Sequence, residues 1–171
     1  MGRDKAFLPY RGGLLVALAA QAVRLAAGSA VLVGDPKVYG RLGFPAIPDR
    51  YPGEGPLGGI LTALGHTTAE WNVVAACDMP NITAEFLTAL IQAAERSGAD
   101  ALVPAGPSGR PEPLCAAYHL RARPGLAAAF ASGQRAVRAA LQTLRVTLFA
   151  APEPSIFQNV NTPEEWAAHG A

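Results

Sequence analysis

The carboxylate of Asp78 follows a continuous apolar run that reads as a strand, "WNVVAAC" (71–77). Such a run predicts a strand buried on both faces of a sheet. A carboxylate sealed inside without a partner would be costly, but at the carboxyl edge of a sheet it can hold a hard cation. Mg²⁺ takes one or two carboxylates and completes its shell with phosphate and water. Asp78 is therefore a candidate magnesium ligand, and the alternative is that it caps the turn before Pro80.

The stretch "DRYPGEGPLGG" (49–59) leads from an expected strand into an expected helix. Glycines such as Gly53 and Gly58 let the backbone approach a ligand closely, and the helix start offers free N–H groups for a phosphate. An ordinary glycine-rich connection has the same composition. Asp49, at the strand end, either accepts two N–H bonds from a guanine edge or caps the turn.

Two further loops carry polar pairs. Asn159 and Asn161 stand on alternate residues next to a helix start, so both amides face one side if the segment is extended. They could contact phosphate, metal-bound water or a pterin, or Asn161 belongs to the turn and Thr162 caps the helix. Arg110 and Glu112 precede an expected strand, where they either line a second substrate pocket or form a surface ion pair.

The elements that must position these residues alternate along the chain. Strands are expected at 29–33, 44–48, 71–77, 100–104, 113–119 and 145–150. Helices are expected at 13–27, 56–66, 83–96, 121–131, 134–142 and 161–169. This alternation predicts a mostly parallel sheet covered by helices on both faces. In such sheets ligands bind beyond the carboxyl ends of the strands, where the loops described above lie.

Composition narrows the class of protein. The 171 residues predict a single domain, and half of them are apolar, enough for a core. The net charge of +1, from 14 basic and 13 acidic residues, provides no field for nucleic acid or an anionic membrane. Cys77 and Cys115 form no metal or disulfide motif, so we expect reduced thiols and a cytoplasmic protein. Sequence alone gives no apolar run long enough to span a membrane.

Five segments, in order along the chain, together resemble the molybdenum cofactor guanylyltransferase (MobA-type) family of nucleotidyltransferases. They are "MGRDKAFLPY", "PDRYPGEGPLGGILTAL", "AACDMPNI", "RPEPLCAAYH" and "FQNVNTPEEW". The resemblance implies a three-layer α/β/α Rossmann-like fold in one domain, residues 1–171, with a mostly parallel sheet and one antiparallel strand. The family's opening loop has the form LAGG-x-S-x-R-M-G-x-DK. Only its "MGRDK" end is present, so we expect the LAGG part and the first central strand to be missing.

The resemblance also implies roles on the nucleotide side. Lys5 looks like the family's phosphate-binding lysine and would act in catalysis. Asp49, with Gly53 and Gly58, would contact the nucleotide. Asp78 would bind Mg²⁺ and, through it, the nucleotide phosphates.

On the other side of the site, Asn159 and Asn161 look like the family's "NVN" pair, and with Arg110 they would face molybdopterin. The implied reaction is transfer of GMP from GTP to molybdenum-carrying molybdopterin, with release of pyrophosphate. Other proteins of molybdenum cofactor biosynthesis, or acceptor enzymes, are possible partners. Two alternatives stay open: a related enzyme that uses CTP, and a truncated, non-catalytic cofactor-binding protein.

Overall fold

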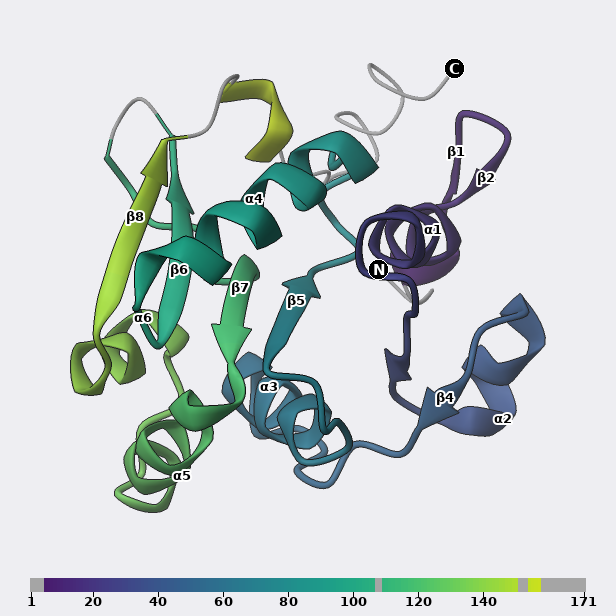
Figure 1. Ribbon diagram of the computed structural model, residues 1–171. Coiled ribbons are helices and arrows are strands. Elements are labelled where there is room, and N and C mark those ends of the chain that lie inside the picture. Colours follow the sequence, from purple (N-terminus) through teal and green to yellow (C-terminus); the bar gives the residue numbers. More distant parts are fainter. Residues whose placement is uncertain (1–4, 107–108, 151–153, 158–171) are drawn as a thin grey trace.

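The computed structural model describes residues 5–106, 109–150 and 154–157, and its centre is a four-stranded mixed sheet (Figure 1). In spatial order its strands are β5 (Trp71–Ala75), β7 (Cys115–His119), β6 (Ala101–Ala105) and β8 (Val146–Ala150). Strand β7 is antiparallel to both neighbours, whereas β6 and β8 are parallel. The predicted α/β architecture with one antiparallel strand is confirmed.

Two smaller strand pairs lie beside this sheet. Strands β3 (Leu32–Val33) and β4 (Ala46–Ile47) are parallel, as expected for the first two strand runs. Strands β1 (Pro9–Tyr10) and β2 (Gly13–Leu14) form a hairpin that the sequence analysis did not predict. Its two turn residues, Arg11 and Gly12, have φ of 43° and 80°. Positive φ at both central positions is the geometry of a type I′ turn, which matches the twist of the flanking strands.

The helices begin and end where local chemistry directs them. Thr83 caps the longest described helix, since its hydroxyl oxygen accepts the Phe86 N–H at 3.2 Å. Gly28 ends the first helix in the left-handed conformation, with φ of 78°. The helices are α1 (Leu15–Ala27), α2 (Pro36–Tyr39), α3 (Pro56–Leu64), α4 (Ala84–Ser97), α5 (Arg123–Ala131) and α6 (Val137–Ala140). Among the described residues, no helix combines the length and hydropathy needed to cross a bilayer.

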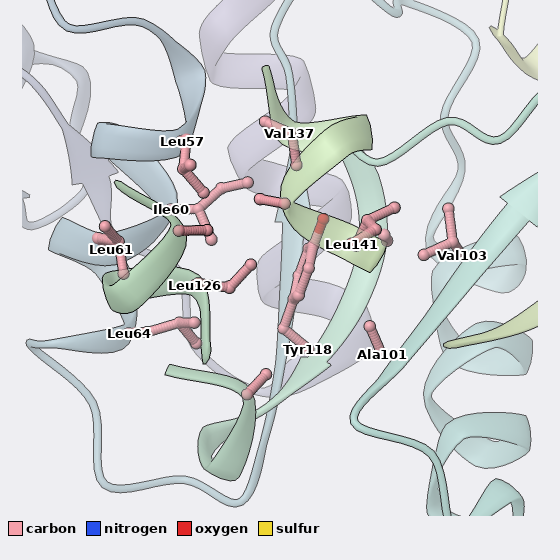
Figure 2. Close-up of a cluster of buried hydrophobic side chains, with 14 residues drawn as sticks. Leu57, Ile60, Leu61, Leu64, Ala101, Val103, Tyr118, Leu126, Val137 and Leu141 are labelled. Atoms are coloured by element: carbon pink, nitrogen blue, oxygen red, sulfur yellow. The ribbon is translucent and has the colours of Figure 1, made fainter. Parts of the chain in front are cut away.

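Helices cover both faces of the sheet, and alternate strand residues point to opposite faces (Figure 1). On one face α3, α5 and α6 pack over Ala101, Val103 and Tyr118, the cluster drawn in Figure 2. On the other face α1 and α4 pack over Leu102 and residues of β7. The two buried layers leave only the sheet's ends and edges for polar chemistry.

Strand β5 differs from its prediction. Every residue of β5 is only half-buried, although the apolar run predicted burial on both faces. Among the described strands β5 lies at an edge of the central sheet. A cavity of about 820 Å³ separates it from β3, with Val33, Ile60 and Val73 among the side chains that line it. The half-burial of β5 follows from this cavity along its open edge.

Other boundaries shift by smaller amounts. The predicted helix at 134–142 is the short α6 followed by a 3₁₀ turn, Leu141–Thr143. Helix α2, which the sequence analysis did not predict, is capped by Asp35, whose carboxylate accepts the Lys37 N–H at 2.9 Å. The closing helix expected at 161–169 lies outside the described residues.

At the opposite end of the sheet from the Asp78 loop, Asp100 joins three segments just before β6. Its carboxylate lies 2.8 Å from the Arg145 guanidinium and 2.8 Å from Arg121 Nε, and it also accepts the Arg145 backbone N–H at 3.0 Å. The hydrogen bonds from Arg145, more than those from Arg121, hold the pKa of the Asp100 carboxyl well below its usual range. This carboxylate joins the start of β6 to the start of β8 and to the turn that follows β7.

We predict that Asp100→Asn lowers the free energy of unfolding at pH 7 by on the order of 1–2 kcal/mol, because charge-assisted hydrogen bonds are lost. The folded-state pKa lies below the unfolded value near 3.9. The carboxylate's contribution is therefore complete above about pH 4 and is lost as the pH falls toward the folded-state pKa. Urea unfolding of both proteins at pH 7 and pH 3 measures this, and an equal difference at the two pH values would contradict it.

Candidate active site

Asp78 lies in the turn that follows β5. Its Oδ1 atom is buried, and among the described residues it has no hydrogen-bond partner. A buried carboxylate oxygen with no donor is unfavourable unless something positively charged approaches it. A carboxylate oxygen is a suitable ligand for a hard cation such as Mg²⁺. Within 5–106, 109–150 and 154–157, no three His, Cys, Asp or Glu side chains are grouped so that they could hold a metal ion.

Asn81, three residues after Asp78, ties this turn to two other segments. The Tyr10 hydroxyl donates to Asn81 Oδ1 at 3.3 Å, and Asn81 Nδ2 donates to the Ser155 carbonyl at 3.0 Å. Tyr10 is almost fully buried, so its hydroxyl has a fixed position. Nothing in the sequence distinguished Asn81 as a site residue except its place within "CDMPN".

Lys5 is half-buried in a short 3₁₀ turn, Lys5–Phe7, that packs against α1. The turn closes with the Leu8 N–H donating to the Lys5 carbonyl at 3.0 Å. Phe7 stacks on Tyr39, with 5.5 Å between ring centroids. Together with the Tyr10–Asn81 hydrogen bond, these contacts fix the segment that carries Lys5 relative to the Asp78 turn.

The glycine-rich loop begins at Asp49, whose carboxylate is bound within the loop. Its Oδ1 accepts the Tyr51 N–H at 3.0 Å and lies 2.9 Å from the Thr62 hydroxyl. Thr62, on α3, is 2% exposed; its oxygen also accepts the Arg50 N–H at 3.1 Å and lies 3.0 Å from the Gly58 carbonyl. Asp49 thus caps the turn, which was the alternative considered above. Its nucleotide contact stays a prediction.

Gly53 and Gly58 shape this loop for different reasons. Gly53 has φ of 79°, a left-handed conformation that other residues rarely adopt. A Cβ atom at Gly58 would lie 2.8 Å from Tyr51 Cβ and 3.4 Å from the Tyr51 carbonyl oxygen. Helix α3 therefore starts directly against the loop's backbone. Backbone conformation and packing account for both glycines, and their nucleotide contacts stay predictions.

The loop that precedes β7 lies beside the end of β5. The Ala76 N–H donates to the Leu114 carbonyl at 2.7 Å, which places this loop next to the Asp78 turn. Arg110 is exposed in the same loop. Glu112 Oε1 lies 3.5 Å from Arg138 Nη2, and among the residues described here no ion pair joins Glu112 to Arg110. Asn159 and Asn161 lie outside the described residues, so their proximity to Arg110 stays a prediction.

The Cys115 thiol is not a candidate nucleophile. Cys115 is fully buried in β7, and burial, with a smaller effect of the nearby Glu112 charge, raises the pKa of its thiol to about 12. The thiol therefore stays protonated at neutral pH and is a poor nucleophile. Neither Cys77 nor Cys115 takes part in a disulfide within the described residues.

The sequence pattern of the MobA-like NTP transferase domain matches residues 1–148. The chain belongs to the MobA-like NTP transferase family. The match includes Lys5, the glycine-rich loop, Asp78 and Arg110, and it ends before Asn159 and Asn161.

Two relatives show which proteins of the MobA-like family this chain is similar to. A probable molybdenum cofactor guanylyltransferase of Deinococcus radiodurans is 32% identical over 166 residues, 97% of this chain and 85% of that protein. One of Bacillus cereus is 29% identical over 175 residues, covering 96% of this chain and 86% of the relative. Most of this chain therefore aligns with proteins of that description.

Solved structures agree with the MobA-like assignment. The crystal structure of molybdopterin-guanine dinucleotide biosynthesis protein A from Archaeoglobus fulgidus matches with a TM-score of 0.82 and 30% identity, covering 99% of this chain and 90% of that chain. A 2-C-methyl-D-erythritol 4-phosphate cytidylyltransferase from Thermus thermophilus matches with a TM-score of 0.73 at 20% identity, covering 96% and 91% of the two chains. The second likeness establishes the nucleotidyltransferase fold alone.

We predict that Thr62→Val loosens the glycine-rich loop, because the hydroxyl that joins Asp49 to the Arg50 N–H is lost while the volume is kept. The expected cost is about 1–3 kcal/mol of unfolding free energy, the range for leaving buried polar groups unpaired. Amide hydrogen exchange of residues 49–55 should also accelerate. Urea unfolding and exchange mass spectrometry measure the two effects.

The matched control is Thr62→Ser, which keeps the hydroxyl and should preserve slow exchange in the loop. Equal exchange rates in Thr62→Val and the unsubstituted protein would show that the hydroxyl does not order this loop.

Proposed function

We propose that this chain is a molybdenum cofactor guanylyltransferase that transfers GMP from GTP to molybdopterin. The single observation that carries the proposal is the buried Asp78 oxygen, which has no hydrogen-bond donor among the described residues. It lies after β5, where the resemblance implies that the family's cation would be held. The names of the relatives from Deinococcus radiodurans and Archaeoglobus fulgidus support the choice of substrates.

The proposed chemistry is one displacement at phosphorus. A terminal phosphate oxygen of molybdopterin attacks the α-phosphorus of GTP and forms a new P–O bond. The bond from the α-phosphorus to the bridging oxygen breaks, and that oxygen leaves with its electron pair as pyrophosphate. The attacking phosphate is already anionic, so no strong general base is needed. Catalysis then depends on positioning and on neutralising charge.

The chain's own residues divide these tasks. The Lys5 ammonium would offset negative charge on the phosphates of GTP. The loop that Asp49 and Thr62 hold in shape would receive the nucleotide, with Gly53 and Gly58 allowing close backbone approach. Asp78 would be the protein ligand of Mg²⁺. When bound, Mg²⁺ supplies charge neutralisation at the phosphate oxygens.

The loop that carries Arg110 would form the acceptor side of the site. The loop of Arg110 borders the end of β5 through the Ala76–Leu114 hydrogen bond, so its guanidinium could meet the acceptor's phosphate. Asn159 and Asn161 would complete that side, as the resemblance implied. We further propose a cytoplasmic location, where GTP and the proteins that use the finished cofactor would meet this enzyme.

We predict that Asp78→Asn reduces transfer at least 100-fold, because the cation loses its charged protein ligand. Folding should be intact, and without metal the variant should be as stable as the unsubstituted protein or slightly more so, since a buried unpaired charge is removed. Mg²⁺ with GTP should raise the melting temperature of the unsubstituted protein but not of the variant. Pyrophosphate release and thermal shift give the two readings.

The control for that prediction is Glu95→Gln, the same chemical change on an exposed residue of α4. It should leave both readings unchanged. Transfer by Asp78→Asn at a rate near that of the unsubstituted protein would refute the metal assignment.

The function itself is tested by pyrophosphate release with Mg²⁺ and molybdopterin, run in parallel with GTP and with CTP. Release with GTP at a higher kcat/KM than with CTP is the expected result. A preference for CTP would instead make the chain a cytidylyltransferase. Binding of molybdopterin with no release from either nucleotide would indicate a non-catalytic cofactor-binding protein.

A further inference from the structure

Two arginines on one short segment reach both substrate loops. Arg135 lies two residues before the start of α6, and Arg138 lies within α6. Arg135 contacts the glycine-rich loop, and Arg138 contacts the loop before β7. The two loops are not neighbours in sequence, so this segment links them directly.

Arg135 holds the glycine-rich loop at two points. Its Nε lies 2.5 Å from Glu54 Oε2. Its guanidinium carbon lies 4.0 Å from the centroid of the Phe130 ring, and that ring packs on Tyr51 with 4.7 Å between centroids. Its Nη1 also donates to the Phe130 carbonyl at 2.9 Å, which fixes the guanidinium plane. Tyr51 and Glu54 thus have one common anchor.

Arg138 holds the second loop in a similar manner. Its Nε donates to the Pro111 carbonyl at 3.0 Å, and its Nη2 lies 3.5 Å from Glu112 Oε1. The Glu112 N–H in turn donates to the Pro104 carbonyl at 2.8 Å, so the loop is also fastened to β6. These contacts lie next to Arg110.

The segment that carries both arginines is itself firmly placed. Val137, Ala140 and Leu141 are buried in the core cluster of Figure 2, at 4%, 0% and 7% exposure. Gln134 stiffens the turn before the helix, because its side-chain oxygen accepts the N–H groups of both Arg135 and Ala136 at 3.0 Å. Because α6 is anchored in the core, the two arginines that extend from this segment can hold both loops in fixed positions.

These ion pairs are poor candidates for global stabilisers. The Arg135 and Glu54 side chains are 41% and 49% exposed, and those of Arg138 and Glu112 are 40% and 22% exposed. Exposed pairs contribute little to the free energy of unfolding. Their geometric effect is larger, since misplacing a substrate-binding group by about 1 Å can slow a reaction on the order of 100-fold.

We propose that Arg135 and Arg138 are positioning residues that set the separation of the two substrate loops. Arg135 places residues 51–54 on the nucleotide side, and Arg138 places residues 110–112 on the acceptor side. The assignment of a substrate to each loop rests on the proposed function. The placing of the loops rests on the contacts alone.

Steady-state kinetics with each substrate varied separate the two roles. Arg135→Ala should raise the KM for GTP about tenfold while leaving the KM for molybdopterin within about twofold, and Arg138→Ala should do the reverse. Arg135→Lys keeps the charge but loses the planar fork, so it should recover only part of the loss. The urea midpoints of all three variants should stay close to that of the unsubstituted protein.

A mutant cycle with Glu54 tests the contact itself. Glu54→Ala should raise the KM for GTP, and adding Arg135→Ala should raise it by less than the product of the two single effects. Equal increases in both KM values for each arginine variant, or unchanged KM values, would overturn the proposal.

Hydrogen exchange gives a reading that does not depend on activity. In the protein without substrates, Arg135→Ala should speed exchange at residues 51–55 but not at 109–112, and Arg138→Ala should show the opposite pattern. If the unsubstituted protein releases no pyrophosphate, the proposed function fails while this exchange pattern still decides the positioning roles. Unchanged exchange in both variants would overturn them.

Discussion

The central sheet is covered by apolar layers on both faces, and this constraint decides where charged groups can lie. Ala101 and Val103 face the layer of α3, α5 and α6, while Leu102 between them faces the layer of α1 and α4. A charge inside either layer would lose its hydration without compensation. Polar chemistry is therefore confined to strand ends and edges. Asp78 and Asp100 lie at opposite ends of the sheet. Within the described residues Asp78 Oδ1 has no hydrogen-bond partner, whereas the Asp100 carboxylate is bonded to Arg145 and Arg121.

The loops at the candidate site are held by individual polar contacts rather than by the core. Thr62 closes the glycine-rich loop on itself, Asn81 joins the Asp78 turn to the β1–β2 hairpin, and Arg135 joins the glycine-rich loop to α6. Each contact contributes modestly to stability by itself. Together they hold the glycine-rich loop and the Asp78 turn against neighbouring elements, so both can be ordered without being buried in the core.

Local signals in the sequence predicted the elements well. The helices expected at 13–27 and 83–96 and the strand expected before Asp78 all lie within a few residues of those positions. The burial of β5 was predicted wrongly, because a run of apolar residues reports what a strand can tolerate and not which neighbours it has. The partners of Thr62, Asn81 and Arg135 were not predictable for the same reason. The hydrogen bonds that join Thr62 to Arg50, Asn81 to Tyr10 and Arg135 to Glu54 span 12, 71 and 81 residues of sequence.

The contact between Gly58 and Tyr51 limits which residue types positions 51 and 58 can accept. A methyl group at position 58 would meet the Tyr51 Cβ atom at 2.8 Å, and every residue type except glycine has a Cβ at both positions. No replacement of Tyr51 other than glycine would make room for alanine at position 58. A larger residue at position 58 therefore requires the loss of the Tyr51 side chain, which would also remove the ring that packs on Phe130. Substitution at position 58 is disfavoured by the contact with Tyr51, independently of any ligand.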